Sequence, residues 1–141
     1  MKTSAAGISL IKKFEGCKLS AYVDVAGVLT IGYGHTGKDV VPGLTITQMM
    51  ADALLVTDLE KFEAKVMKYD PIYHWTQPEF DALVSFAYNI GSIDALTDNG
   101  KRDRQTIRSS MLMYRKAGGH ILPGLEKRRN LELRVFNTDI H

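Results

Sequence analysis

The chain has 141 residues, of which 45% are hydrophobic and 24% are charged, and its formal net charge is +2. This composition excludes a disordered chain and is typical of one soluble globular domain. No apolar run reaches the roughly 18 residues that a membrane-spanning helix needs, and the single cysteine excludes an internal disulfide.

The charge is distributed unevenly along the chain. Residues 1–100 carry eight Lys/Arg and twelve Asp/Glu, a net charge of −4, whereas residues 101–141 carry ten Lys/Arg and four Asp/Glu, a net charge of +6. A basic C-terminal part suits a polyanionic partner such as a cell wall or a nucleic acid, or else it is a solvated helix face.

The N-terminal part is predicted to form a helix followed by a small sheet. Over residues 4–14 apolar side chains recur at three-residue spacing, which predicts a helix that Gly16 ends. Residues 19–35 alternate between apolar and polar types around a turn candidate at residues 26–27. This pattern predicts a β-hairpin.

The rest of the chain is predicted to be helical. The expected helices lie at about 47–66, from a cap at Thr76 to Gly91, at about 105–116, and at about 123–136. We therefore expect a single α+β domain over residues 1–141. It would have a small β-lobe at about 17–45, a larger α-lobe at about 1–16 and 46–141, and a ligand-binding cleft between the lobes.

Three polar residues are expected at that cleft, namely Glu15, Asp24 and Thr30. Glu15 ends the first predicted helix, where the helix dipole disfavours an ionised carboxylate, and burial beside Phe14 and Tyr22 would act in the same direction. The protonated form is the one that a general acid needs. Asp24 lies at a hairpin turn, where it is expected to be wetter and ionised. Two carboxyl groups in different protonation states suit glycosidic bond hydrolysis.

The relation between Asp24 and Thr30 depends on the length of the hairpin loop. We expect a three-residue loop to pair the two residues directly and a two-residue turn to offset them by one, and the sequence does not fix this register. Taken alone, Asp24 also fits an ordinary turn residue and Thr30 an ordinary strand residue.

The stretch F-E-G-C-K-L-S-A-Y-V-D-V-A-G-V-L-T-I-G-Y-G-H-T resembles the phage lysozymes of the T4-like and lambdoid endolysin group, glycoside hydrolase family 24. The motif of that family is Glu, eight residues, Asp, five residues and Thr, followed by Ile-Gly-x-Gly-His, and every position is met here. D-A-L-V-S-F-A-Y-N-I-G at 81–91 resembles the long core helix of the family. K-A-G-G with L-P-G-L-E-K-R-R at 116–129 resembles its C-terminal signature.

The resemblance implies a lysozyme-like fold and a muramidase that cleaves the β-1,4 bond between N-acetylmuramic acid and N-acetylglucosamine in peptidoglycan. In this reading Glu15 is the general acid on the glycosidic oxygen. Asp24 positions or activates the attacking water, or stabilises the transition state, and Thr30 helps to hold that water. No metal or cofactor is implied, and the four histidines show no metal-ligand spacing.

The resemblance also suggests supporting residues, namely Tyr22, His35, Asn89 and Arg128. His35 is expected to form a structural pair with Asp58 rather than to act as a base. Arg128 or Arg129 matches an arginine that reaches toward the catalytic Glu in the family, although a solvated basic helix face fits equally well. Residues 92–110 depart from the family pattern.

Three other functions compete with this interpretation: a lytic transglycosylase that acts on the same bond, a catalytically inactive wall-binding protein, and a nucleic-acid binder. Asp24 with Thr30 argues for hydrolysis, and no nucleic-acid-binding motif is present.

The expected partner is the peptidoglycan glycan strand, with no nucleic acid and no stable membrane insertion. We expect a monomer without a signal peptide. It would remain in the host cytoplasm until a separate holin permeabilises the membrane, and would then act in the periplasm and cell wall.

Overall fold

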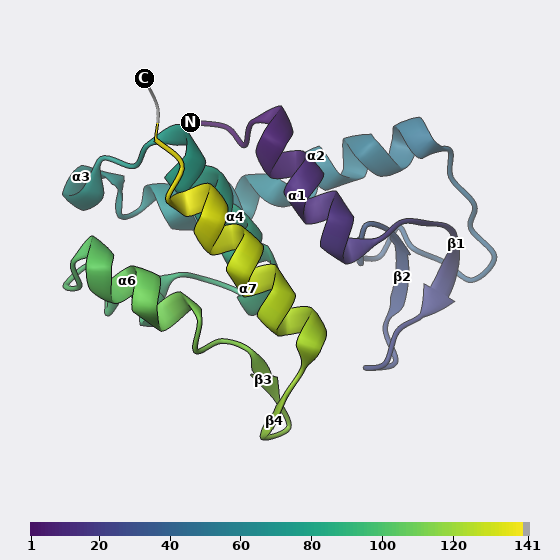
Figure 1. Cartoon of the computed structure of the whole chain (residues 1–141). Helices are drawn as coiled ribbons and strands as arrows, with labels where there is room; N and C mark the ends of the chain where they lie inside the picture. The colour runs from purple at the N-terminus through teal and green to yellow at the C-terminus, as the bar shows by residue number, and fades with distance from the viewer. Residues whose placement is uncertain (140–141) are drawn as a thin grey trace. The chain divides into compact units, whose positions relative to one another are not determined.

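The computed structural model describes residues 1–139 and is mostly helical, with two small two-stranded sheets (Figure 1). The elements in chain order are α1 (Ala5–Glu15), β1 (Lys18–Val23), β2 (Leu29–Gly32), α2 (Gln48–Met67), α3 (Asp70–Tyr73), α4 (Gln77–Ile90), α5 (Asp94–Thr97), α6 (Arg104–Met111), β3 (Lys116–Ala117), β4 (His120–Ile121) and α7 (Pro123–Phe136). The predicted α+β class is confirmed. Within residues 1–139, no helix combines the length and the apolar character that crossing a bilayer requires.

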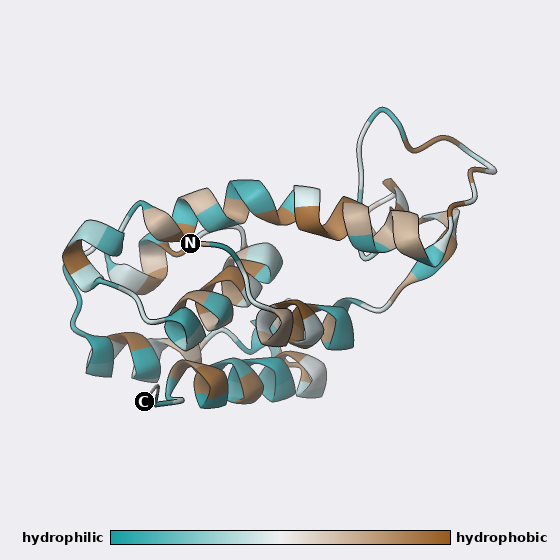
Figure 2. Ribbon diagram, turned by 90° about the horizontal axis from the view of Figure 1, so that it is seen from above, coloured by the Kyte–Doolittle hydropathy of each residue, from teal (hydrophilic) through white to brown (hydrophobic). Residues whose placement is uncertain are grey.

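The chain divides into two compact units. One is formed by residues 11–60, and the other by residues 1–10 together with residues 61–139. Along the helices hydrophobic and hydrophilic residues alternate (Figure 2), as expected of amphipathic helices that bury one face.

The core of the larger unit lies where α4 packs against α7. Most of its fully buried side chains are apolar or aromatic, among them Phe80, Leu83, Phe86, Ile107 and Phe136, and the charged Arg129 and Glu132 are fully buried there as well. The Phe86 ring meets the Tyr114 ring edge-on, with 5.0 Å between the ring centroids.

The predicted start of α4 at Thr76 is confirmed by a complete capping box. The Thr76 hydroxyl accepts from the Glu79 backbone N–H at 3.2 Å, and the Glu79 carboxylate accepts from the Thr76 N–H at 3.0 Å. The helix ends at Gly91, whose N–H donates to the carbonyl of Ala87. Local hydrogen bonding therefore defines both ends of this helix.

The predicted helix at about 105–116 is too long at its C-terminal end. Asp103 caps α6 by accepting from the Thr106 N–H at 2.8 Å, but the helix stops at Met111. Lys116 and Ala117 instead pair with Ile121 and His120 in an antiparallel hairpin. Gly118 and Gly119 both adopt positive φ, at 57° and 80°, which is what a tight two-residue hairpin turn requires.

The smaller unit is built around the antiparallel pair β1–β2, which confirms the predicted hairpin. Tyr22 pairs with Thr30 and Val23 with Leu29. The segment at residues 44–46 extends this sheet at the far edge of β1 by two hydrogen bonds of 2.9 Å, from the Ala21 N–H to the Leu44 carbonyl and from the Ile46 N–H to the Leu19 carbonyl.

Candidate active site

Asp24 closes the tip of the first hairpin with its own side chain. Its Oδ1 accepts from the backbone N–H groups of Ala26 at 2.8 Å and of Val28 at 2.9 Å. Its backbone N–H donates to the Val28 carbonyl at 2.9 Å, and its carbonyl accepts from the Gly27 N–H at 3.0 Å. Gly27 has φ +82°, a conformation that glycine adopts without strain. Among the described residues the second carboxylate oxygen, Oδ2, carries no hydrogen bond.

The register of this hairpin differs from both expected alternatives. The loop has three residues, 25–27. A loop of this length pairs the two residues that flank it, so Asp24 lies across from Val28 and not across from Thr30. Thr30 pairs with Tyr22, two positions farther along. The expected direct pairing of Asp24 with Thr30 is therefore wrong, as is the offset by one. The two residues are diagonal neighbours on one face of the hairpin, because side chains alternate along a strand.

Thr30 is buried, with 3% of its surface exposed. Its hydroxyl donates to the Val28 carbonyl at 2.9 Å. A hydroxyl has a single proton, so the Thr30 Oγ1 remains available to any other partner as an acceptor only. The backbone of Val28 therefore orients both polar side chains: its N–H donates to Asp24 and its carbonyl accepts from Thr30.

Tyr22 lies on the same face of the hairpin as Asp24 and Thr30. It faces Thr30 in the strand pair, and the ammonium of Lys18 lies 4.4 Å from its ring centroid. A cation at this distance from an aromatic ring is attracted to the ring. The hairpin thus brings together three of the residues that the sequence singled out.

Glu15 is the last residue of α1 and is half-buried. The helix ends there, as predicted, because Gly16 adopts a φ of +66°, which is outside the right-handed helical region and which glycine adopts without strain. One turn earlier, the Lys12 ammonium contacts the Asp52 carboxylate at 3.0 Å, and this hydrogen bond raises the pKa of Lys12. The last turn of α1 is thereby attached to α2.

His35 lies between two carboxylates. Its Nδ1 contacts Asp58 at 2.7 Å, which confirms the predicted contact, and its Nε2 contacts Asp39 at 2.8 Å. Carboxylates only accept, so both contacts are hydrogen bonds when the ring is protonated and carries a proton on each nitrogen. Burial lowers the pKa of His35, but the hydrogen bonds to Asp58 and Asp39 outweigh it and raise the pKa above its ordinary value. Asp39 was not predicted as a partner of His35.

Asn89 and Arg128 belong to the contact of α4 with α7. Asn89 accepts from Arg129 at 2.8 Å, and Arg128 donates to Glu132 at 3.2 Å and to the Ser85 carbonyl at 3.0 Å. Arg128 is 4% exposed and Arg129 is fully buried. The alternative of a solvated basic face is therefore wrong for these two arginines, because the buried carboxylate of Glu132 contacts both of them.

The family model of phage lysozyme matches residues 12–132. The chain belongs to the phage lysozyme family. A relative in this family, the endolysin of Lactococcus phage c2, is 41% identical over 142 residues, which cover 99% of this chain and 62% of the relative. The chain therefore spans about three fifths of that relative. The endolysin of Salmonella phage P22 is 34% identical over 145 residues, and there the match covers 94% of this chain and 99% of the relative.

Solved structures of phage lysozyme relatives have the same fold. The endolysin from Escherichia coli O157:H7 phage FAHEc1 superposes with a TM-score of 0.80 at 36% identity, covering 100% of this chain and 96% of that one. The muramidase domain of SpmX from Asticaccaulis excentricus superposes with a TM-score of 0.80 at 35% identity, covering 98% and 99%. The expected lysozyme-like fold is thus confirmed.

Proposed function

We propose that this chain is an endolysin, a muramidase that hydrolyses the β-1,4 bond between N-acetylmuramic acid and N-acetylglucosamine in peptidoglycan and so lyses the host cell. Relatives named endolysin and muramidase support this activity. The observation that carries the proposal is the hairpin geometry, in which one oxygen of Asp24 is fixed by two backbone N–H groups and the other is open beside Thr30.

In the proposed reaction Glu15 is the general acid. It donates its proton to the glycosidic oxygen as the bond from that oxygen to the anomeric carbon breaks, so the leaving sugar departs as a neutral alcohol. The charge that develops on the ring is oxocarbenium-like, and the carboxylate of Asp24 stabilises it.

The hairpin also supplies the two acceptors that a water nucleophile needs. Since the Thr30 proton is used on the Val28 carbonyl, the Thr30 oxygen accepts one hydrogen of the water. The open oxygen of Asp24 accepts the other. The water then presents a lone pair to the anomeric carbon, and Asp24 takes up the proton that the water loses on attack.

The test is digestion of purified peptidoglycan followed by analysis of the products. Hydrolysis leaves reducing N-acetylmuramic acid ends, one for each bond cleaved. A lytic transglycosylase would leave anhydro-sugar ends, and a wall-binding protein would leave the glycan intact. Either of the last two results would contradict the proposal.

We further propose that the chain acts as a monomer on the glycan strands and reaches them from the host cytoplasm after a separate holin opens the membrane. The packing of α1 supports this route. Leu10 and Ile11 are buried and Lys12 pairs with Asp52, so these side chains of α1 are engaged in contacts of the folded chain. One relative, from Bacteriophage PS119, is named a SAR-endolysin, so the experiment must tell export by the chain itself from release by a holin.

That experiment is expression in a Gram-negative host without a holin. We expect growth to continue until chloroform permeabilises the membrane, and lysis to follow rapidly. Spontaneous lysis that stops when the general secretion machinery is blocked would contradict the proposed route. Light scattering of the purified chain tests the monomer.

A further inference from the structure

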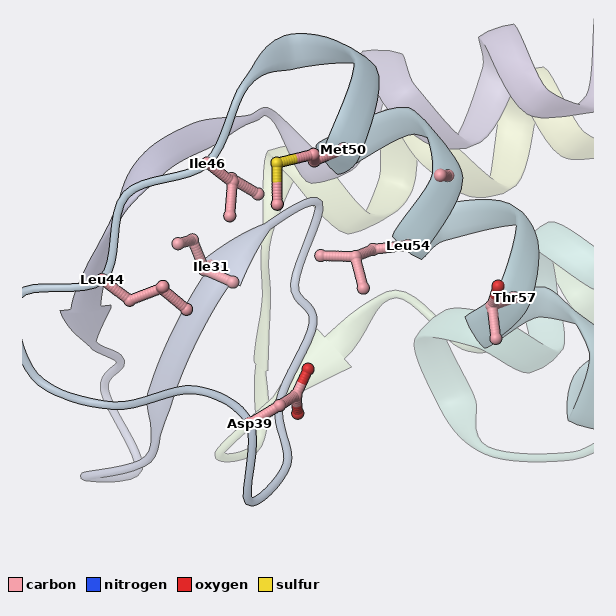
Figure 3. Close-up of a pocket in the computed structure, with 8 residues that line it drawn as sticks. Ile31, Asp39, Leu44, Ile46, Met50, Leu54 and Thr57 are labelled. Carbon is pink, nitrogen blue, oxygen red and sulfur yellow. The ribbon is translucent and has the colours of Figure 1, made fainter.

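The smaller unit contains a pocket that the proposed reaction does not use. It has a volume of about 420 Å³ and lies between α2 and the segment that follows β2 (Figure 3). Its wall is mostly aliphatic, formed by Ile31, Leu44, Ile46, Met50 and Leu54, with Asp39 at one end. Pockets of a few hundred cubic ångströms with an apolar wall and few polar groups are the usual sites of small ligands.

The aliphatic wall is partly open to water. Figure 3 shows the side chains of Ile31, Leu44, Ile46, Met50 and Leu54 directed toward a common space. Met50 is 50% exposed, whereas Ile31 is fully buried. Apolar surface left in water is unfavourable, and methionine side chains adapt readily to the shape of a ligand. An aliphatic group fits this space.

The charged end of the pocket is anionic. Of the lining residues in the described part of the chain, Asp39 is the one that carries a charge. Its carboxylate is held at 2.8 Å by His35, which Asp58 holds on the other side at 2.7 Å. Two carboxylates and one imidazolium give the cluster a net charge of −1, so a single cation fits there and an anion is disfavoured.

We propose that this pocket binds a primary alkylammonium group on a flexible aliphatic chain, of the kind found in a lysine-type side chain of a peptide. The methylene groups contact the aliphatic wall and the ammonium donates to the Asp39 carboxylate. Because the pocket is separate from Glu15, Asp24 and Thr30, this proposal does not depend on the hydrolytic activity.

The first experiment titrates Nα-acetyl-lysine methylamide into the full chain and follows the side-chain methyl signals by NMR. We expect saturable shifts confined to the methyl groups of the pocket wall. The Nε-acetylated analogue, which has the same chain without the charge, should bind roughly fivefold or more weakly. Butylamine carries the ammonium and an aliphatic chain without the peptide, so it should bind as well; its affinity relative to the lysine probe distinguishes a free amine from a peptide side chain as the source of the group.

Two variants and a control complete the test. Asp39→Asn should weaken binding of the lysine probe roughly fivefold and leave binding of the Nε-acetylated probe unchanged. Glu60→Gln removes the same charge from an exposed position of α2 outside the pocket and should change neither. Leu54→Phe places a larger side chain in the wall of the pocket and keeps Asp39 and His35, so it should weaken binding of every probe.

Three results would overturn the proposal: no saturable shift of the wall methyl groups, equal affinity for the charged and acetylated probes, or undiminished binding by Leu54→Phe. Because none of these measurements uses cell lysis, failure here is distinguishable from failure of the proposed muramidase activity.

Discussion

The two hairpins of this chain are closed by different chemistry. In the β3–β4 hairpin, Gly118 and Gly119 make the turn through backbone conformation alone. In the β1–β2 hairpin, the Asp24 side chain holds the turn by accepting from Ala26 and Val28. The same carboxylate is the one that we propose acts on the substrate. In the β1–β2 hairpin, therefore, the Asp24 carboxylate both stabilises the turn and, in our proposal, takes part in the reaction.

The largest effect should come from separating these two roles. Asp24→Asn keeps an acceptor oxygen for the two backbone N–H groups, so the turn should persist while lysis falls by about 10²–10⁴-fold. Glu15→Gln should lose a similar factor. Turbidity of permeabilised Gram-negative cells measures lysis, and circular dichroism and thermal melting check the fold. Lysis near the wild-type rate in either variant would show that the roles are assigned wrongly.

The next largest effect concerns the pairing of His35 with Asp58, which follows the first hairpin. In the described part of the chain no such pair follows the second hairpin. Asp58→Asn should destabilise the fold by about 1–3 kcal/mol, because it removes a charged partner of the half-buried His35. The raised pKa of His35 means that its contribution is fully present below its ordinary value of 6.5 and is lost as the pH rises through the value in the fold.

The hydrogen bond from His35 also lowers the pKa of Asp39, so the contribution of Asp39 is present above its ordinary value of 3.8 and is lost as the pH falls through the value in the fold. Urea unfolding of Asp58→Asn should show the full loss at pH values just below 6.5, and in alkaline buffer the difference from wild type should shrink. Asp39→Asn, whose carboxylate is 62% exposed against 24% for Asp58, should lose less. A difference that is constant with pH would contradict this account.

The smallest effect on stability comes from a matched pair of glycine substitutions. Gly27 and Gly119 both have positive φ, and a Cβ on either one meets no atom within 4 Å, so alanine adds backbone strain without a clash. Each change should cost about 1–2 kcal/mol. Only Gly27→Ala should also reduce lysis, because it disturbs the turn that holds Asp24. An equal loss of lysis in Gly119→Ala would remove the distinction between the hairpins.

Local signals in the sequence were enough to place most of the elements. Helix periodicity with a cap at Thr76 and a stop at Gly91 placed α4, and the alternation after Gly16 placed the first hairpin. The short helices α3 and α5 were missed, because four residues are too few to show periodicity. The β3–β4 hairpin was missed because its strands have two residues each.

The site was predicted less completely, since its partners are set by tertiary contacts. Asp39 lies in a loop with no repeating pattern, and Glu132 looks like an ordinary helix residue until α7 packs on α4. Away from the hairpin, the guanidinium of Arg104 pairs with Glu79 at 2.8 Å. No local pattern in the sequence predicts an ion pair between residues that lie 25 positions apart.

The backbone of Val28 sets the number of residues between Asp24 and Thr30. It binds Asp24 through its N–H and Thr30 through its carbonyl, so the interval of five residues between them is fixed by the closure of hydrogen-bonded rings. Inserting one residue into this interval would turn Thr30 to the opposite face of the hairpin, because side chains alternate along a strand. Length variation in this family should therefore be tolerated in other loops and be incompatible with activity in this one.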